Sequence, residues 1–282
     1  MAKRPSVAVV GCGRAGGSIA LALDRAGYRI AALWSRSRAG RQRAHRLLDA
    51  PVLATPADAA HEADVTFVAV PDDAVAGVAA WVAEGVVPGR RVVHTSGSVS
   101  VEALAPAREA GARIGSVHPL QTLPDARRGA DALVGAAVAV TCDPSDRRSL
   151  HRLVSAWGGR PFPLPDESKT LYHAAAVFAS NYVVASLWAA AELLERAGVP
   201  NGNALLWPLV RQSVENVAAR GAERSITGPV ARGDAGVVRR HIDALRANGA
   251  DTGPILEAYR SLALLTASLA GTDDGILDEV RS

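Results

Sequence analysis

The segment Gly11–Gly16 constrains the fold of this chain more than any other feature of its sequence. It reads Gly-Cys-Gly-Arg-Ala-Gly, directly follows the apolar run Val7–Val10 and leads into a helical pattern over Ser18–Arg25. In a strand–turn–helix unit, such glycines permit the tight turn, let the backbone approach a pyrophosphate and let the helix pack close to the strand. A glycine-rich turn in an ordinary α/β protein is the alternative. The predicted dinucleotide contacts are Gly11, Cys12, Gly13, Arg14, Ala15 and Gly16.

Strand-like and helical patterns alternate over the first part of the chain. Alternation of this kind, with continuous apolar strands, predicts an N-terminal α/β domain with a Rossmann-type doubly wound parallel sheet. The expected strands are Val7–Val10, Arg29–Trp34, Val65–Val70, Arg91–Thr95, Arg113–Val117, Ala136–Thr141 and Arg160–Leu164. The expected helices between them are Ser18–Ala26, Arg38–Leu48, Asp73–Glu84, Val101–Ala110 and Ser145–Trp157.

The pattern changes after Asp166, where helical periodicity continues and no convincing strand appears. The 282 residues leave room for two domains of roughly 150 residues each. We therefore expect a domain over residues 1–165 and an all-α domain over residues 166–282. Helices such as Ser261–Leu269 are apolar over much of their surface, so the helical domain is expected to pack against the first domain and to form a homodimer.

Composition narrows the classes of partner. The net charge of +3 is scattered and aromatic residues are only 4%, which argues against a nucleic-acid surface. No apolar run reaches the ~18 residues of a membrane span, and the first residues pass at once into a strand, so neither a membrane segment nor a signal peptide is expected. The two cysteines, Cys12 and Cys142, make no disulfide framework or metal site. We expect a cytoplasmic protein.

The end of the second strand indicates which dinucleotide is bound. An NAD site usually places a carboxylate here for the ribose, whereas this chain reads Ser35-Arg36-Ser37-Arg38. Hydroxyl groups and guanidinium groups suit the 2′-phosphate of NADP. We therefore predict NADP(H), with Ser35, Arg36 and Arg38 as its readers; a solvated start to a surface helix is the alternative.

Polar loops follow three further strands and are expected to meet at the carboxyl edge of the sheet. Val70 and Pro71 would flank the ribose and nicotinamide, and Ser96 would contact the cofactor. Ser98 and His118 would contact the substrate. Each of these polar residues could instead be an ordinary turn residue.

The helix that starts near Lys169 carries the predicted chemistry. Lys169 and Lys3 are the only lysines among 31 basic residues, and an ammonium group can give up a proton where a guanidinium cannot. Lys169 and His173 lie one turn apart, so either could donate a proton while Lys169 stabilises an oxyanion. Asn181 and Ser180 would orient the substrate or Lys169. The alternative is an exposed lysine and a core-edge histidine on an amphipathic helix.

A Gly/Pro-bounded loop over Thr227–Asp234 contains a further candidate. Arg232 could bind a substrate carboxylate with two parallel hydrogen bonds. A surface turn followed by a helix cap at Asp234 explains the same residues.

These motifs, in this order, resemble a bacterial family that joins a Rossmann-like NADP-binding domain to a helical domain of unknown function. The chain is more distantly similar to 6-phosphogluconate dehydrogenase, ketopantoate reductase, prephenate dehydrogenase and pyrroline-5-carboxylate reductase. All four share a Rossmann domain followed by a helical domain that often dimerises. Lys169 matches the catalytic lysine of 6-phosphogluconate-type dehydrogenases, although His173 stands where they have an asparagine. His118-Pro119 resembles the His-Pro of prephenate dehydrogenases.

The residues and the resemblance together predict an NADPH-dependent reductase of a small 2-oxo acid. The resemblance implies 2-dehydropantoate (ketopantoate) as the substrate. A cyclic-imine reductase or a hydroxy-acid dehydrogenase could use the same site. A non-catalytic NADP(H)-binding sensor would keep Gly11–Gly16 without needing Lys169 or His173.

Overall fold

The computed structural model describes residues 4–248, 253–272 and 274–281. It divides into two compact units, Met1–Asn181 and Tyr182–Ser282. The predicted boundary at residues 165/166 precedes helix α8 (Lys169–Ala179), whereas the chain divides into the two units after this helix. The first unit therefore contains the sheet together with the helix that carries Lys169 and His173.

A seven-stranded sheet forms the centre of the first unit, in the order β2-β1-β3-β4-β5-β6-β7. Every strand predicted from the sequence is present, and the first four consist almost entirely of buried residues, as a sheet covered on both faces requires. The strands are β1 (Val7–Val10), β2 (Ile30–Trp34), β3 (Val65–Val68), β4 (Arg91–His94), β5 (Arg113–Pro119), β6 (Ala137–Cys142) and β7 (Arg160–Pro163).

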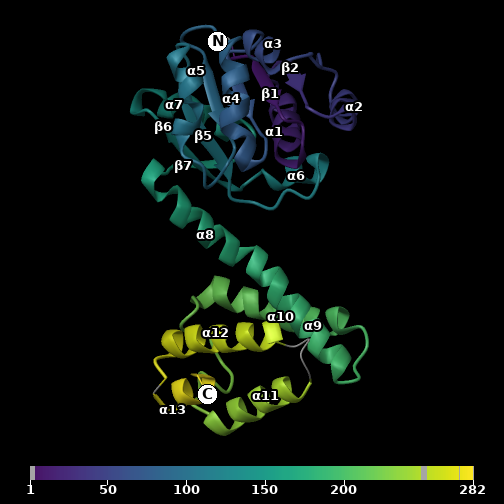
Figure 1. Ribbon diagram of the computed structural model, residues 1–282, viewed down its shortest axis with the longest axis vertical. Helices are drawn as coiled ribbons and strands as arrows, with labels where there is room; N and C mark the ends of the chain where they lie inside the picture. The colour runs from purple at the N-terminus through teal and green to yellow at the C-terminus, as the bar shows by residue number, and fades with distance from the viewer. Residues whose placement is uncertain (1–3, 249–252, 273, 282) are drawn as a thin grey trace. The chain divides into compact units, whose positions relative to one another are not determined.

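Helices cover both faces of this sheet and enclose a separate apolar core on each (Figure 1). The helices on one face are α1 (Arg14–Arg25), α2 (Arg38–Leu47), α6 (Ala126–Ala132) and α7 (Pro144–Ala156). Those on the other are α3 (Pro56–His61), α4 (Val75–Ala83), preceded by the 3-10 turn η1 (Asp72–Ala74), and α5 (Ala105–Glu109), preceded by η2 (Val101–Leu104). The sequence did not predict α3 and α6, which have only 6 and 7 residues and are too short for a clear helical period.

The sheet departs from the predicted all-parallel arrangement at one pair of strands. Strand β6 runs antiparallel to β5, with Pro119 opposite Val138, while every other pair is parallel. The connection between them carries α6, which packs mainly against α1 instead of crossing the sheet. The chain therefore starts β6 at the same edge where β5 ends.

The described residues of the second unit form helices joined by turns and contain no strand. Its buried core is small and comes from α11, α12 and α13, with Val238, Ile242 and Ala267 among its members. In contrast, α9 and α10 expose large apolar side chains, including Trp188 (60% exposed) and Leu209 (65% exposed). The helices are α9 (Asn181–Arg196, whose first residue belongs to the first unit), α10 (Gly202–Arg220), α11 (Ala235–Ala247), α12 (Gly253–Ala270) and α13 (Asp274–Arg281).

One helical stretch of the described chain, Asp166–Arg196, is long and apolar enough to cross a membrane. Its mean hydropathy is 1.5 over the best window. The expectation of no such segment overlooked it because uncharged polar residues, among them His173, Ser180 and Asn181, interrupt its apolar run. A single stretch of this kind is weak evidence for a membrane, since helices of soluble proteins pass the same test.

Candidate active site

The phosphate turn adopts the backbone that its glycines predict. Gly11 has a φ of 106°, and a Cβ on it would lie 2.2 Å from the carbonyl oxygen of Ala69. A Cβ on Gly16 would lie 2.0 Å from the carbonyl oxygen of Gly11, so the start of α1 packs directly on the turn. Beside Gly13, by contrast, no heavy atom stands within 4 Å of the Cβ position. The turn is thus closed on its protein side and open where a pyrophosphate would bind.

The start of α1 has amide groups available for an anion. Its N-cap residue, Gly13, has no side chain, so no side-chain oxygen caps the helix. Free amide groups and the positive end of a helix dipole favour a phosphate group. Within the turn, burial raises the pKa of the Cys12 thiol to about 11, so this side chain stays neutral and does not repel an anion.

A cavity of about 750 Å³ lies at the carboxyl ends of the parallel strands, next to the phosphate turn. It is lined by that turn, by the residues after β3 and β5, and by one side of α8. This arrangement brings together many of the residues singled out from the sequence. They are Gly13, Arg14, Ala15, Val70, His118, His173, Ser180 and Asn181.

The side chains of His118 and His173 form the polar centre of this cavity. Their ring centroids are 6.1 Å apart, and Nδ1 of His118 lies 2.7 Å from the hydroxyl oxygen of Tyr172. A tyrosine hydroxyl that donates to Nδ1 leaves the ring hydrogen of a neutral His118 on Nε2. Burial, then the charges of Lys169 and His173, lower the pKa of His118 to about 4 despite the opposing effect of Asp72. His118 is therefore neutral at physiological pH.

Lys169 is buried and is not among the residues that line this cavity. Its Nζ donates hydrogen bonds to the carbonyl oxygen of Ser96 at 3.0 Å and to Oγ of Ser116 at 2.7 Å. Burial lowers the pKa of Lys169 to about 8, while the carboxylates of Asp166 and Asp72 act in the opposite direction. The predicted oxyanion-stabilising role of Lys169 stays a prediction.

Ser96, Ser98 and Pro71 also lie outside the cavity lining, whereas Thr95, at the start of the loop after β4, is part of it. Oγ of Ser96 accepts hydrogen bonds from the amide groups of Ser98 and Val99, and Oγ of Ser98 donates to Asp72 at 2.6 Å. Pro71 precedes the 3-10 turn η1. Ser96 and Ser98 therefore organise the loop after β4, and their predicted contacts with cofactor and substrate stay untested.

A second cavity of about 1060 Å³ also borders the phosphate turn, next to α2. Its basic residues include Arg43 and Arg46 of α2, which are not among the predicted readers of the 2′-phosphate, whereas Ser35, Arg36 and Arg38 are absent from its lining. The spacing of Arg43 and Arg46 on one side of α2 could have indicated them.

The loop after β2 has a structural role of its own. Oγ of Ser37 caps α2 by accepting from the amide of Gly40 at 3.0 Å. The guanidinium of Arg41 donates to the carbonyl oxygens of Ser35 and Arg36 at 3.2 and 2.8 Å. The loop is thus preorganised, and Arg36 and Arg38 are exposed.

Arg232 belongs to the helical unit, where it is exposed in the turn before α11. Asp234 caps α11 by accepting a hydrogen bond from the amide of Val237 at 3.2 Å. The helix-cap interpretation of Asp234 is therefore confirmed, and the role of Arg232 toward a carboxylate stays a prediction.

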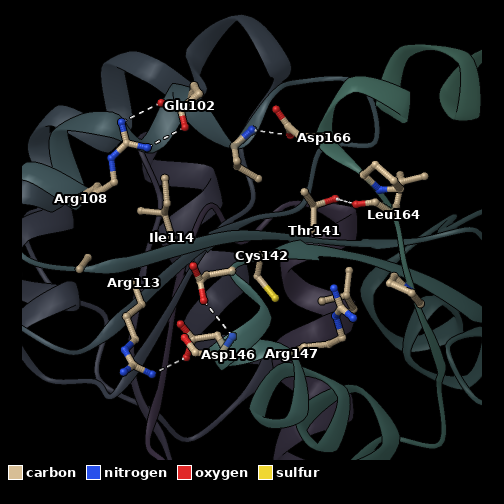
Figure 2. A pocket seen from close by; sticks show the side chains of 17 residues that line it. Glu102, Arg108, Arg113, Ile114, Thr141, Cys142, Asp146, Arg147, Leu164 and Asp166 are labelled. Atoms are coloured by element: carbon tan, nitrogen blue, oxygen red, sulfur yellow. Dashed lines mark hydrogen bonds and ion pairs between the residues drawn. The ribbon is translucent and has the colours of Figure 1, made fainter.

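A third cavity, of about 870 Å³, lies near the start of β5, whereas His118 stands near the end of this strand. Figure 2 shows Arg108 directed at Glu102 and Arg113 at Asp146, with shortest distances of 2.6 and 2.9 Å. These pairs neutralise much of its charge. Burial raises the pKa of Cys142 in the same cavity to about 11, which makes its thiol a poor nucleophile. Within the described residues, no group of His, Cys, Asp and Glu side chains could hold a metal ion.

Comparison with known proteins places these features in two families of domain. Residues 1–119 match the Rossmann-like domain, and residues 136–266 match the domain of unknown function DUF2520. No curated protein matches the chain.

Solved structures show the same fold. BF3122 from Bacteroides fragilis, named as an NADP oxidoreductase, is 25% identical with a TM-score of 0.77, over 95% of this chain and 98% of its own. An imine reductase from Streptomyces aurantiacus is 20% identical (TM-score 0.69, 98% of each chain). The imine reductase of Myxococcus stipitatus in complex with NADP⁺ is 18% identical (TM-score 0.68, covering 99% of this chain and 100% of that one).

The two domain matches divide the chain between β5 and β6, whereas the two compact units divide it after Asn181. The Rossmann-like match covers the first five strands, and the DUF2520 match begins just before β6 and ends within α12. The chain therefore joins a Rossmann-like domain to a DUF2520 domain, the combination that its sequence motifs resemble.

Proposed function

We propose that the chain is an NADP(H)-dependent oxidoreductase that reduces a small oxo acid in the cavity beside the phosphate turn. The observation that carries this proposal is the lining of that cavity. It joins the phosphate turn, through Gly13 and Arg14, to the two imidazole groups of His118 and His173. A nucleotide site and groups able to serve a reacting oxygen thus share one space of about 750 Å³, large enough for a small ligand.

The phosphate turn fits a dinucleotide. The close contacts at Gly11 and Gly16 exclude side chains there, whereas the space beside Gly13 is open. The turn and the start of α1 would hold the pyrophosphate, and basic residues near α2 would favour a 2′-phosphate. Bound NADPH supplies a hydride. The likeness to BF3122, named as an NADP oxidoreductase, and to an imine reductase with NADP⁺ bound supports this choice of cofactor.

The chain's own residues would serve the oxygen of the substrate. Reduction of a carbonyl group adds a hydride to carbon and a proton to oxygen, so the site needs a hydrogen-bond donor at that oxygen. His118 and His173 line the cavity and can provide it. Asn181 and Ser180, on the same wall, can orient the substrate through their side chains.

For the substrate, we propose 2-dehydropantoate, the 2-oxo acid that the resemblance implies. A cyclic imine is the second candidate, because imine reductases share the fold over nearly the whole chain. The reverse reaction on a hydroxy acid would use the same residues.

The proposal is tested by following NADPH absorbance with a panel of 2-oxo acids, including 2-dehydropantoate, and of cyclic imines. We expect turnover with one class, and a His173→Ala variant that loses turnover while NADPH affinity is kept. Thr170→Ala, an exposed neighbour on α8, is the matched control and should behave as wild type. Tight NADPH binding without oxidation across the whole panel would indicate a sensor instead of an enzyme.

We also propose that the helical unit forms a homodimer. Large apolar side chains are exposed on α9, α10 and α12, among them Trp188, Leu209 and Leu265. Apolar surface of this extent usually marks an interface, and a second copy offers the same helices in a symmetric contact. A dimer in solution without detergent would fit the expected cytoplasmic location, whereas a requirement for detergent would point to a membrane.

A further inference from the structure

Lys169 opens α8, yet its ammonium group lies in the interior of the sheet-containing unit. Only 1% of the residue is exposed. Its Nζ donates to the carbonyl oxygen of Ser96 at 3.0 Å and to Oγ of Ser116 at 2.7 Å. Oγ of Ser116 in turn donates to the same carbonyl oxygen at 3.3 Å. These three residues form a closed hydrogen-bonded ring that joins α8 and β5 to the loop after β4.

Two carboxylates fix the rest of that loop. Oγ of Ser98 donates to Asp72 at 2.6 Å, and Oγ of Ser100 donates to Asp166 at 2.5 Å. The end of the loop, at Ser98 and Ser100, is thus anchored by acidic side chains. Its start, at Ser96, is anchored by the ammonium of Lys169. Hydrogen bonds to charged groups are stronger than neutral ones, so both anchors restrict the loop.

Gly97 stands between these anchors and touches the imidazole groups of the cavity. A Cβ at this position would lie 2.8 Å from both Cε1 and Nε2 of His118, and 2.8 Å from Cδ2 of His173. The backbone of the loop is therefore packed against both rings. Its placement determines where the two rings can stand in the cavity.

The contacts of Lys169 do not suit direct contact with a substrate. Its ammonium donates to Ser96 and Ser116, and Lys169 is not among the cavity-lining residues. To donate a proton to a substrate oxygen, the side chain would have to leave a buried position in which two of its three N–H groups have acceptors. Breaking such bonds in the interior is costly.

We propose that Lys169 is a positioning residue, which ties the loop after β4 to β5 and so holds Gly97 against the rings of His118 and His173. The action of these rings on a substrate rests on the proposed reductase function, whereas their placement by Lys169 does not. The proposal assigns the only lysine of the candidate site a role other than proton transfer.

The test compares Lys169→Met, which removes both charge and donors, with Lys169→Gln, which keeps a neutral donor. Histidine ring signals are followed by NMR in the full chain, and turnover is followed with NADPH. We expect Lys169→Met to shift the signals of both His118 and His173 and to lower kcat about 10- to 100-fold, because displaced groups react poorly. Lys169→Gln should recover part of the loss. Thr170→Ala serves as the control.

The pKa of His118 provides a readout that does not depend on turnover. The groups that act on this ring are Tyr172, His173, Lys169 and Asp72. Removing the positive charge of Lys169 should raise the pKa of His118 above its wild-type value. If Lys169→Met does not fold, Ser116→Ala carries the test, since it keeps the lysine and removes one of its two acceptors. This variant should shift the same histidine signals.

The outcomes separate this inference from the proposed function. Unchanged histidine signals in a folded Lys169→Met variant that has lost turnover would make Lys169 the proton donor and overturn the inference. Equal losses of kcat in the Met and Gln variants, with the basic limb of the pH profile removed, would do the same. Suppose that Lys169→Met shifts the histidine signals, but the wild-type protein oxidises NADPH with none of the substrates in the panel. This result would support the inference and refute the proposed reductase function.

Discussion

Replacing Gly97 with alanine is the sharpest test of how the cavity is built. The φ of Gly97 is not among the positive values in the chain, so the backbone accepts alanine and the effect comes from its methyl group alone. That methyl would lie 2.8 Å from three ring atoms of His118 and His173. Carbon atoms prefer separations of about 3.5 to 4.0 Å. The rings or the loop must therefore move by roughly 1 Å.

A displacement of this size predicts a specific kinetic result. A misplacement of about 1 Å at reacting groups can cost about 100-fold in rate, so we expect kcat/KM to fall by roughly that factor. NADPH affinity should change little, because Gly97 lies outside the phosphate turn. Overpacking typically lowers the free energy of unfolding by about 1 to 3 kcal/mol. The loss here should lie at the low end of this range, because the rings border a cavity into which they can move.

The assay is steady-state NADPH oxidation together with NADPH binding and urea unfolding of the same variant. Gly77→Ala is the matched control, because no heavy atom lies within 4 Å of its Cβ position and its helical site gains propensity. Its kinetics should equal those of wild type. A folded Gly97→Ala variant with wild-type kcat/KM would refute the claim that the loop fixes the two rings.

Three further predictions follow from separate features. Arg43→Ala and Arg36→Ala should each weaken NADPH binding more than NADH binding. Comparison of the Kd values of the two variants identifies which arginine reads the 2′-phosphate. Unchanged NADPH affinity in both variants would remove the basis for NADP preference. His94 is fully buried, and burial, together with the charge of Lys169, lowers its pKa from 6.5 to about 4, so folding keeps it neutral. As pH falls, the unfolded chain takes up a proton on His94 before the folded chain does, so up to about 3 kcal/mol of stability is lost between pH 6.5 and 4. His94→Gln should flatten this part of the curve of stability against pH. An unchanged curve would contradict the assignment. Trp188→Glu should convert a dimer to a monomer in light scattering, and a persistent dimer would place the interface elsewhere.

Sequence patterns were sufficient for the framework of the fold. The strand positions, the phosphate turn and the all-helical character after Asp166 all follow from local patterns, because apolar runs, glycine spacing and helical periods are written in neighbouring residues. The direction of β6 could not be predicted in this way. It depends on α6, a short helix that packs against α1 from far along the chain.

The candidate site was predicted only in part for the same reason. His118 and His173 could be singled out by residue type, but nothing local indicates that Gly97 touches both rings or that Tyr172 bonds to His118. Likewise, the rarity of lysine drew attention to Lys169, and only its contacts show that the ammonium is enclosed.

The location of Lys169 bears on how a reductase site of this kind can operate. A buried ammonium beside His94 and His118 favours their neutral forms, since its charge lowers the pKa of both rings. A neutral imidazole can donate a hydrogen bond to a developing oxyanion without bringing a full positive charge next to the nicotinamide. Lys169 can thus influence the chemistry of the cavity through charge and through the loop it holds, while its own protons stay on Nζ. Removal of the Lys169 side chain should therefore change the pKa and ring signals of the histidines, while the NADPH affinity of the phosphate turn stays close to that of wild type.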